Sequence, residues 1–255
     1  MGQKYCKIYK RINHRSSTYG RIVTHKTAKG NKEMINITPL AKSMYPNTKF
    51  GAMVVKGISS SAGRAVMDSI VAEEIEGIKS KYPDYDRKAA LTTEPLCHYT
   101  SYYKQFKKSY HVLGQLESVL LKGKSIPPVG VPVEAMFLAE IKDLLLTAGH
   151  DSDLIEGALT IDAAVGSVSY KGLSGQEQNL ANNDLYLADE KGVVSSILGG
   201  PDHRTRITEL TKNALYFVYG AGGVTEPLIR AHLETIFSYL SQAIQGVEIQ
   251  TMEII

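Results

Sequence analysis

Leu185-Tyr-Leu-Ala-Asp-Glu-Lys-Gly-Val-Val-Ser-Ser-Ile-Leu-Gly-Gly-Pro-Asp-His-Arg-Thr205 is the stretch of this sequence that most narrows the fold. Its two apolar runs predict two strands joined by a tight turn at Glu190–Gly192. The second strand leads into a loop, 199–205, whose paired glycines let the backbone approach another group closely. The loop then presents a carboxylate, an imidazole, a guanidinium and a hydroxyl in succession. Polar clusters at strand ends are often functional, although a simple turn pair would also explain Asp202 and Arg204.

The rest of the chain supplies helices first and strands later. The apolar run within 51–58 predicts a buried strand, and the 3.6-residue period then predicts helices. These helices cover 63–80, 95–122 with a break near 109–111, 131–148 and, near the end, 226–245. Further strands are expected at 157–163, 166–171, 184–188, 193–198, 214–220 and, as an edge strand, 247–252. This order predicts an α+β fold, with 34–255 as a single domain.

The charge of the chain is unevenly distributed. Of 255 residues, 43% are hydrophobic and 22% charged, a composition that supports a substantial core. Residues 1–33 hold 9 of the 29 Lys and Arg and 1 of the 26 Asp and Glu, a net charge of +8, which leaves 20 basic and 25 acidic residues, or −5, in 34–255. Segment 1–33 has no helical or strand period and is predicted to be disordered. We favour translation from Met34, with a nucleic-acid arm or a transit peptide as alternatives.

Composition also argues against several classes of protein. Two cysteines, Cys6 and Cys97, cannot form a disulfide framework, which predicts a reducing, cytoplasmic setting. The longest apolar run, 131–148, is interrupted by four charged residues, so no membrane helix is expected. The glycine loop 57–64 lacks the Lys-Ser/Thr of a phosphate loop. Because no His or Cys cluster has zinc spacing around His150, we expect no metal there. We also expect no cofactor.

The first part of the helical region 95–122 carries aromatic residues at 99, 102, 103, 106 and 110 among lysines at 104, 107 and 108. Such a mixture can stack nucleic-acid bases, but a helix that packs its tyrosines on the core is favoured. The lysines form a candidate basic patch for RNA: Lys104, Lys107, Lys108, Lys122 and Lys124.

Two blocks of this sequence resemble a known family. The strand with its Ala-Asp turn, the second strand, the Gly-Gly loop and the later Thr211-Lys-Asn213 resemble the B3/B4 domain of the phenylalanyl-tRNA synthetase beta subunit, as found in free-standing B3/B4 proteins. The segment His150-x-x-Asp153-Leu, with Gly157 soon after, is similar to a second block of that family. The resemblance covers roughly 125–222 and extends more loosely back to residue 50.

The resemblance implies a β-sandwich-like core flanked by helices, with a pocket that hydrolyses mischarged tyrosyl-tRNA. By position, His150 matches the editing-site histidine, and Gly199 and Gly200 match the pocket loop. The family's next residue is acidic, whereas this chain has Pro201, which makes Asp202 the nearest substitute. The family's asparagine before the helix is Phe137 here, and its arginine in the following strand is Asp162, so the substrate can differ or hydrolysis can be lost.

Hydrolysis of an aminoacyl ester requires chiefly a positioned water and stabilisation of the oxyanion. We expect His150 to orient or deprotonate that water, with Asp202 as its catalytic partner. Asp202 or Glu134 is expected to bind the α-ammonium group. The expected substrate-binding set is Glu134, Gly199, Gly200, His203, Arg204 and Thr205, in which Arg204 holds the terminal phosphate and Thr205 donates to the oxyanion. Alternatively, His150 only ends the preceding helix, where a cation is favourable.

The sequence therefore leaves two functions open. One is an editing hydrolase that acts on aminoacyl-tRNA in trans. The other is a non-catalytic module that binds an amino acid, a nucleotide or RNA in the same pocket. The net charge of −5 in 34–255 argues against tight binding of tRNA without a local basic patch, because phosphate contacts supply most nucleic-acid affinity. The sequence does not fix an oligomeric state.

Deletion of residues 1–33 tests where any RNA affinity resides. We expect the 34–255 fragment to keep its tRNA affinity and any deacylation, because the predicted pocket lies wholly in that part. The measurement is filter binding of tRNA at several salt concentrations with both forms. Loss of binding on deletion, with a shallower salt dependence, would instead assign the affinity to the basic segment.

Overall fold

Strand β10 (Asn213–Gly220) lies inside a four-stranded antiparallel sheet, and all its residues after Asn213 are buried. The computed structural model describes residues 35–255, so segment 1–33 and its predicted disorder fall outside the described residues. The sheet order is β11-β2-β10-β3, which places β3 and β11 at its two edges. The other strands of this sheet are β2 (Lys49–Lys56), β3 (Thr147–Asp151) and β11 (Glu248–Ile254).

A second sheet has five strands in the order β1-β4-β7-β8-β9. Its β1 pairs in parallel with β4, and the other pairs are antiparallel. The strands are β1 (Ile35–Ile37), β4 (Leu159–Ala163), β7 (Leu185–Asp189), β8 (Gly192–Ser196) and β9 (Gly200–Pro201). A two-stranded ribbon, β5 (Ser169–Lys171) with β6 (Glu177–Asn179), joins β4 to β7.

Alternation along β10 decides what each face of the four-stranded sheet contacts. Tyr219 reaches the second sheet, where its hydroxyl is 2.8 Å from Ser195 Oγ. Tyr216 points the other way and donates to the Pro132 carbonyl of a helix, 3.1 Å away. Gly51 and Gly220 lie on this helix-facing side, and a Cβ at either position would lie within 2.6 Å of Ile229. The sheet is therefore covered by the second sheet on one face and by helices on the other.

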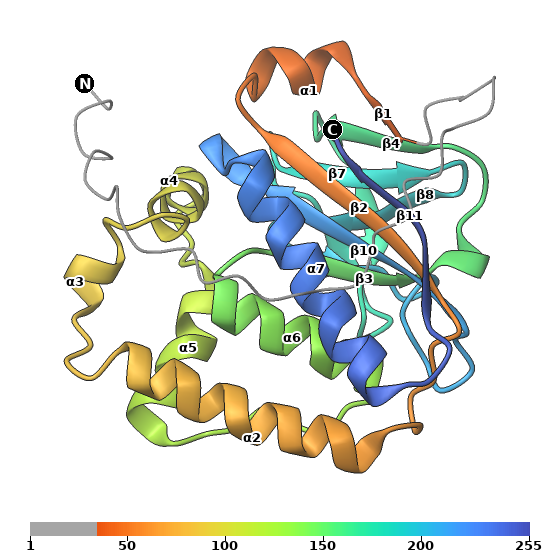
Figure 1. Ribbon diagram of the computed structural model, residues 1–255. Helices are drawn as coiled ribbons and strands as arrows, with labels where there is room; N and C mark the ends of the chain where they lie inside the picture. The colour runs from red at the N-terminus through yellow and green to blue at the C-terminus, as the bar shows by residue number, and fades with distance from the viewer. Residues whose placement is uncertain (1–34) are drawn as a thin grey trace.

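The helices gather mainly on one side of the sheets (Figure 1). Helix α7 lies across the four-stranded sheet and packs on β2 and β10, while α6 packs on α7 and β3, and α2 on both helices. The helices are α1 (Pro39–Met44), α2 (Arg64–Lys81), α3 (Arg87–Ala90), α4 (Leu96–Gln105), α5 (His111–Lys122), α6 (Val131–Asp143) and α7 (Glu226–Ala243). Short 3₁₀ turns cover Ser152–Leu154 and Ala221–Gly223. None of the helices described combines the length and apolarity that a membrane span requires.

The α+β class is confirmed, and most elements lie where the periodicity placed them. The strand at β2, the helices α2, α4, α5 and α7, and the edge strand β11 all agree with the sequence prediction. The tyrosines of α4 are core residues, as favoured: Tyr99, Tyr102 and Tyr103 are at most 3% exposed. The short elements β1, α1, α3, β6 and β9 had no sequence prediction, because two to six residues show no clear period.

The helix predicted over 131–148 is wrong in its last turn. Helix α6 ends at Asp143, and Leu144 takes a left-handed conformation with φ of 61° while its N–H still bonds to the Glu140 carbonyl. From Thr147 the chain is strand β3, which contains His150. His150 therefore does not end a helix. The apolar run Leu144–Leu146 fits either structure, and pairing of β3 with β10 decides between them.

The Tyr99 hydroxyl connects helix α4 to both β10 and the start of β3. It donates to the Tyr219 carbonyl at 2.7 Å and accepts the Leu146 N–H at 3.0 Å, in a fully buried position. Tyr99→Phe leaves two buried backbone groups without this partner, so we expect a loss of about 1–3 kcal/mol in the free energy of unfolding. Urea denaturation measures it, with the half-buried Tyr82→Phe as control. Equal stability of the two variants would contradict this role of the hydroxyl.

Candidate functional site

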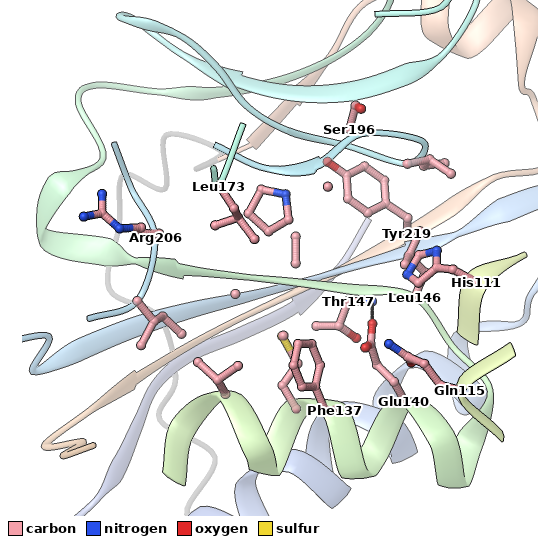
Figure 2. A pocket seen from close by; sticks show the side chains of 18 of the residues that line it. His111, Gln115, Phe137, Glu140, Leu146, Thr147, Leu173, Ser196, Arg206 and Tyr219 are labelled. Carbon is pink, nitrogen blue, oxygen red and sulfur yellow. Dashed lines mark hydrogen bonds between the residues drawn. The ribbon is translucent and has the colours of Figure 1, made fainter. Parts of the chain in front are cut away.

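A cavity of about 400 Å³ opens at the free edge of β3. Helices α5 and α6 form one wall, and the β8–β9 turn with Arg206 and Ile207 forms the other. Figure 2 shows Phe137 and Glu140 rising from α6 beneath Thr147, with Ser196, Leu173 and Tyr219 across the space. The lining is mostly apolar, and its polar side chains are His111, Gln115, Glu140, Thr147, Ser196, Arg206 and Tyr219.

Glu140 is the buried acid of this cavity. Its side chain is 2% exposed, and Oε1 accepts the Thr147 N–H at 2.7 Å. Burial raises the pKa of Glu140 to about 8, because the apolar surroundings penalise the charged form, and the Thr147 N–H offsets this only in part. With its pKa at about 8, the Glu140 carboxyl can lose its proton when a cation binds beside it.

His111 stands on the α5 side of the cavity with a defined pattern of hydrogen bonds. Tyr103 donates its hydroxyl proton to the Ile197 carbonyl at 2.8 Å, and the same oxygen lies 3.2 Å from His111 Nδ1. Since the hydroxyl has one proton, Nδ1 must be the donor in the second bond. Nε2 of the neutral ring is then an acceptor. Desolvation lowers the pKa of His111, which favours this neutral form.

Gln115 adds an unused acceptor to the same wall. Its Oε1 is buried and has no hydrogen-bond partner among the described residues. A buried polar atom without a partner is costly, and in a cavity it marks a place where a ligand donor is favoured.

His150 lies between the two sheets, fully buried, and not in the lining of the cavity. Nδ1 is 2.8 Å from Thr205 Oγ1, and Nε2 is 3.1 Å from Ser195 Oγ. Thr205 donates in turn to Asp202, and Ser195 contacts the hydroxyl of Tyr219. Burial lowers the pKa of His150 to about 3, with Arg204 adding to the effect. The structure thus brings together His150, Thr205 and Asp202, which reach the cavity through Ser195 and Tyr219.

The charged residues predicted for the substrate take part in other contacts. Glu134 forms a two-pronged ion pair with Arg64 at 2.6 Å and accepts the Gly130 N–H at the start of α6. Arg204 binds Asp189 at 2.8 Å and the Leu154 carbonyl at 2.7 Å. The ring of His203 lies 3.1 Å from the Leu173 carbonyl. Among the eight predicted site residues, all within the described part of the chain, Gly200 lines the cavity directly.

The paired glycines serve the loop in two different ways. Gly199 allows close approach, because a Cβ there would lie 2.4 Å from the Tyr170 hydroxyl. Gly200 adopts a φ of 73°, which favours glycine. Phe137 and Pro201, two of the positions that depart from the family pattern, both line the cavity. Asp162 instead accepts from the Thr38 hydroxyl at 2.5 Å, on β4.

Sequence reasoning did not assign Glu140, His111 or Arg206 to the site. Glu140 did carry a signal, since it is an acid inside an otherwise apolar helical run. His111 and Arg206 had none, because their relation to the cavity depends on how distant segments pack. Within residues 35–255, no three His, Cys, Asp or Glu side chains form a group that could hold a metal ion.

These features define an α+β protein with a cavity of small-molecule size and a buried acid at a sheet edge. One solved structure to which this chain is similar is an N-terminal fragment of the phenylalanyl-tRNA synthetase beta subunit from Pyrococcus horikoshii, at 14% identity and a TM-score of 0.46. The match covers 88% of this chain and 52% of that one, so this chain spans about half of its length. No family model and no curated protein matches the sequence.

Glu140 should make stability depend on pH. Its pKa of about 8 in the folded protein lies above the ordinary 4.5, so as pH rises between these values the unfolded chain loses this proton first. The contribution of Glu140 to the free energy of unfolding therefore falls across that window and is constant above it. We expect Glu140→Gln to gain stability relative to the unsubstituted protein on going from about pH 5 to about pH 8, by up to a few kcal/mol.

Urea denaturation of both proteins at several pH values measures this difference. The exposed Glu248→Gln, on the opposite edge strand, serves as control and should show no such trend. Parallel pH profiles for Glu140→Gln and the unsubstituted protein would contradict a raised pKa.

Proposed function

We propose that the cavity binds the aminoacyl group of an aminoacyl-tRNA and that the protein hydrolyses its ester bond. The observation that carries this proposal is the buried carboxyl of Glu140 inside a mostly apolar cavity. A lone buried carboxylate is unfavourable, and a cationic partner that enters with the ligand relieves the cost. The α-ammonium of an amino acid is such a partner. Glu140 thus takes the role that the sequence assigned to Asp202 or Glu134.

The walls and volume of the cavity suit the rest of an aminoacyl group. Met136, Phe137, Ile197 and Ile207 offer apolar surface for a side chain. A space of about 400 Å³ falls within the range of small-ligand pockets. The unpaired Gln115 Oε1 offers an acceptor to a polar group on that side chain. These features favour an amino acid with an apolar body.

Hydrolysis requires a base near the ester carbonyl. His111 Nε2 is a free acceptor on a ring oriented by Tyr103, so it can orient and deprotonate a water. The predicted catalytic residues His150 and Asp202 then support the opposite wall through Thr205, Ser195 and Tyr219. We assign them a positioning role in this proposal. Their direct participation stays a prediction from the sequence.

The tRNA part of the proposal rests on the sequence resemblance and on nearby cations. Arg206 belongs to the cavity lining and can contact the terminal phosphate, a role that the sequence gave to Arg204. Lys104, Lys107 and Lys108 are exposed and precede His111 by a few residues. Because residues 34–255 carry a net charge of −5, such a local basic patch is required for binding.

The test is deacylation of tyrosyl-, phenylalanyl- and other aminoacyl-tRNAs by the full chain. We expect Glu140→Gln to raise KM for the preferred substrate, because the ammonium loses its partner. His111→Gln should lower kcat by roughly 10²–10⁴-fold, as for loss of a general base. His150→Ala and Asp202→Ala should also lose activity, because they remove the support of the wall. Glu248→Gln is the control and should behave as the unsubstituted protein.

Calorimetry of free amino acids separates binding from catalysis. Binding of an ammonium to Glu140 should release a proton near neutral pH, so the measured enthalpy should depend on the ionisation enthalpy of the buffer. Amino-acid binding without faster deacylation of any aminoacyl-tRNA would establish the non-catalytic module instead. If the protein neither binds a free amino acid nor deacylates any aminoacyl-tRNA, the proposed function is wrong.

A further inference from the structure

A second histidine lies behind the cavity, on the helix-facing side of β3. His232 of α7 is fully buried, and its Nε2 lies 2.7 Å from the hydroxyl of Thr147. Its Nδ1 lies 2.9 Å from Asp143 Oδ2, at the end of α6. Thr147 itself lines the cavity, next to Glu140 and Phe137 (Figure 2). An acid, an imidazole and a hydroxyl therefore stand in one hydrogen-bonded row that ends at the cavity.

The proton positions in this row follow from the partners. The carboxylate of Asp143 is an acceptor, so Nδ1 of neutral His232 carries the ring proton. Nε2 then has the lone pair and accepts the Thr147 hydroxyl proton. This is the arrangement in which a carboxylate orients an imidazole and the imidazole activates a hydroxyl, recognised by geometry rather than by sequence order.

We propose that Thr147 is a nucleophile, activated by His232 and Asp143, that takes the acyl group in a covalent step. The inference deepens the proposed function, because the acyl group is that of the ester bound at Glu140. None of these three residues was among the site residues expected from the sequence. The reaction then takes two steps that share the Thr147 oxygen, and the water that His111 orients attacks in the second step.

The position of Thr147 suits an ester whose ammonium is held by Glu140. The backbone N–H of Thr147 donates to that same carboxyl at 2.7 Å, so the residue that carries the hydroxyl is in direct contact with the residue that binds the ammonium. In an α-amino ester the carbonyl carbon is two bonds from the nitrogen. An ester whose ammonium contacts Glu140 therefore has its carbonyl carbon on the side of Thr147 Oγ1.

An amide of β3 can stabilise the oxyanion. Along the free edge of the strand, the N–H groups of Thr147 and Asp151 point outward, to Glu140 and to the Thr205 carbonyl. The N–H of Gly149, between them, points the same way by strand alternation, and Gly149 lines the cavity. A Cβ at Gly149 would lie about 3.0 Å from Ile207 Cδ1, so a side chain there would narrow this part of the cavity.

The chemistry balances without a cofactor. Thr147 Oγ1 attacks the ester carbonyl carbon while its proton moves to His232 Nε2. The tetrahedral intermediate collapses, the bond to the ribose oxygen breaks, and that oxygen takes the proton from His232. Water then attacks the Thr147 ester and gives one proton to His232. Collapse releases the amino acid, and Thr147 recovers its hydroxyl proton from His232.

The test uses p-nitrophenyl acetate with the full chain, because this probe lacks an ammonium and so does not depend on Glu140. We expect a burst of nitrophenol of about one equivalent and, by mass spectrometry, an acetyl group on the peptide that contains Thr147. Thr147→Ser should keep the adduct, and Thr147→Val should lose it. His232→Asn should slow acylation by roughly 10²–10⁴-fold. Thr235→Val, on the same helix as His232, is the control.

The outcomes distinguish this inference from the proposed function. An acetyl adduct elsewhere, or none at all on the folded protein, would overturn the nucleophile. Unchanged deacylation of aminoacyl-tRNA by a folded Thr147→Val would overturn it as well, while leaving the proposed function in place. A Thr147 adduct that depends on His232 would support it even where no aminoacyl-tRNA is hydrolysed, and the proposed substrate alone would then be wrong. Circular dichroism of each variant checks folding.

Discussion

The hydrogen bond from the Thr147 N–H to the Glu140 carboxyl is the contact on which the site depends. It joins the last full turn of α6 to the first residue of β3, across the left-handed Leu144. Tyr99 and Tyr110 hold the same connection from the core, through the Leu146 N–H and the Leu144 carbonyl. Because the chain leaves the helix here and not a turn later, β3 can pair with β10 and still present a free edge.

That edge explains why the cavity lies where it does. An unpaired strand edge exposes backbone donors and acceptors, which proteins normally cover. Here Thr205 and Arg206 cover the Asp151 end, while the Thr147 end is left to the side chains of α5 and α6. Apolar helix walls and backbone amides thus meet in one space. The buried acid at its base lies in an environment that raises its pKa, and perturbed acids of this kind are often found at functional sites.

The sequence predicted the fold class and most long elements, because periodicity reports which face of an element is buried. It failed at residues 144–148, where an apolar run suits a helix and a buried strand equally, and only pairing with β10 distinguishes them. Gly200 and Pro201 of the loop 199–205 line the cavity, but composition could not tell Arg204, bound to Asp189, from Arg206, which also lines the space. Glu140 was visible as an acid in an apolar run, yet its role depends on packing around it.

Strand β3 separates two histidines with different surroundings. His150 points between the sheets, where Thr205 and Ser195 occupy both ring nitrogens and leave none for a ligand. Thr147, three residues earlier, points to the opposite face and meets His232. The two-residue period of the strand therefore places His150 and the Thr147–His232 pair on opposite faces of β3. If β3 were the helix that the sequence predicted, residues 147 and 150 would lie near one face, and this division of roles could not exist.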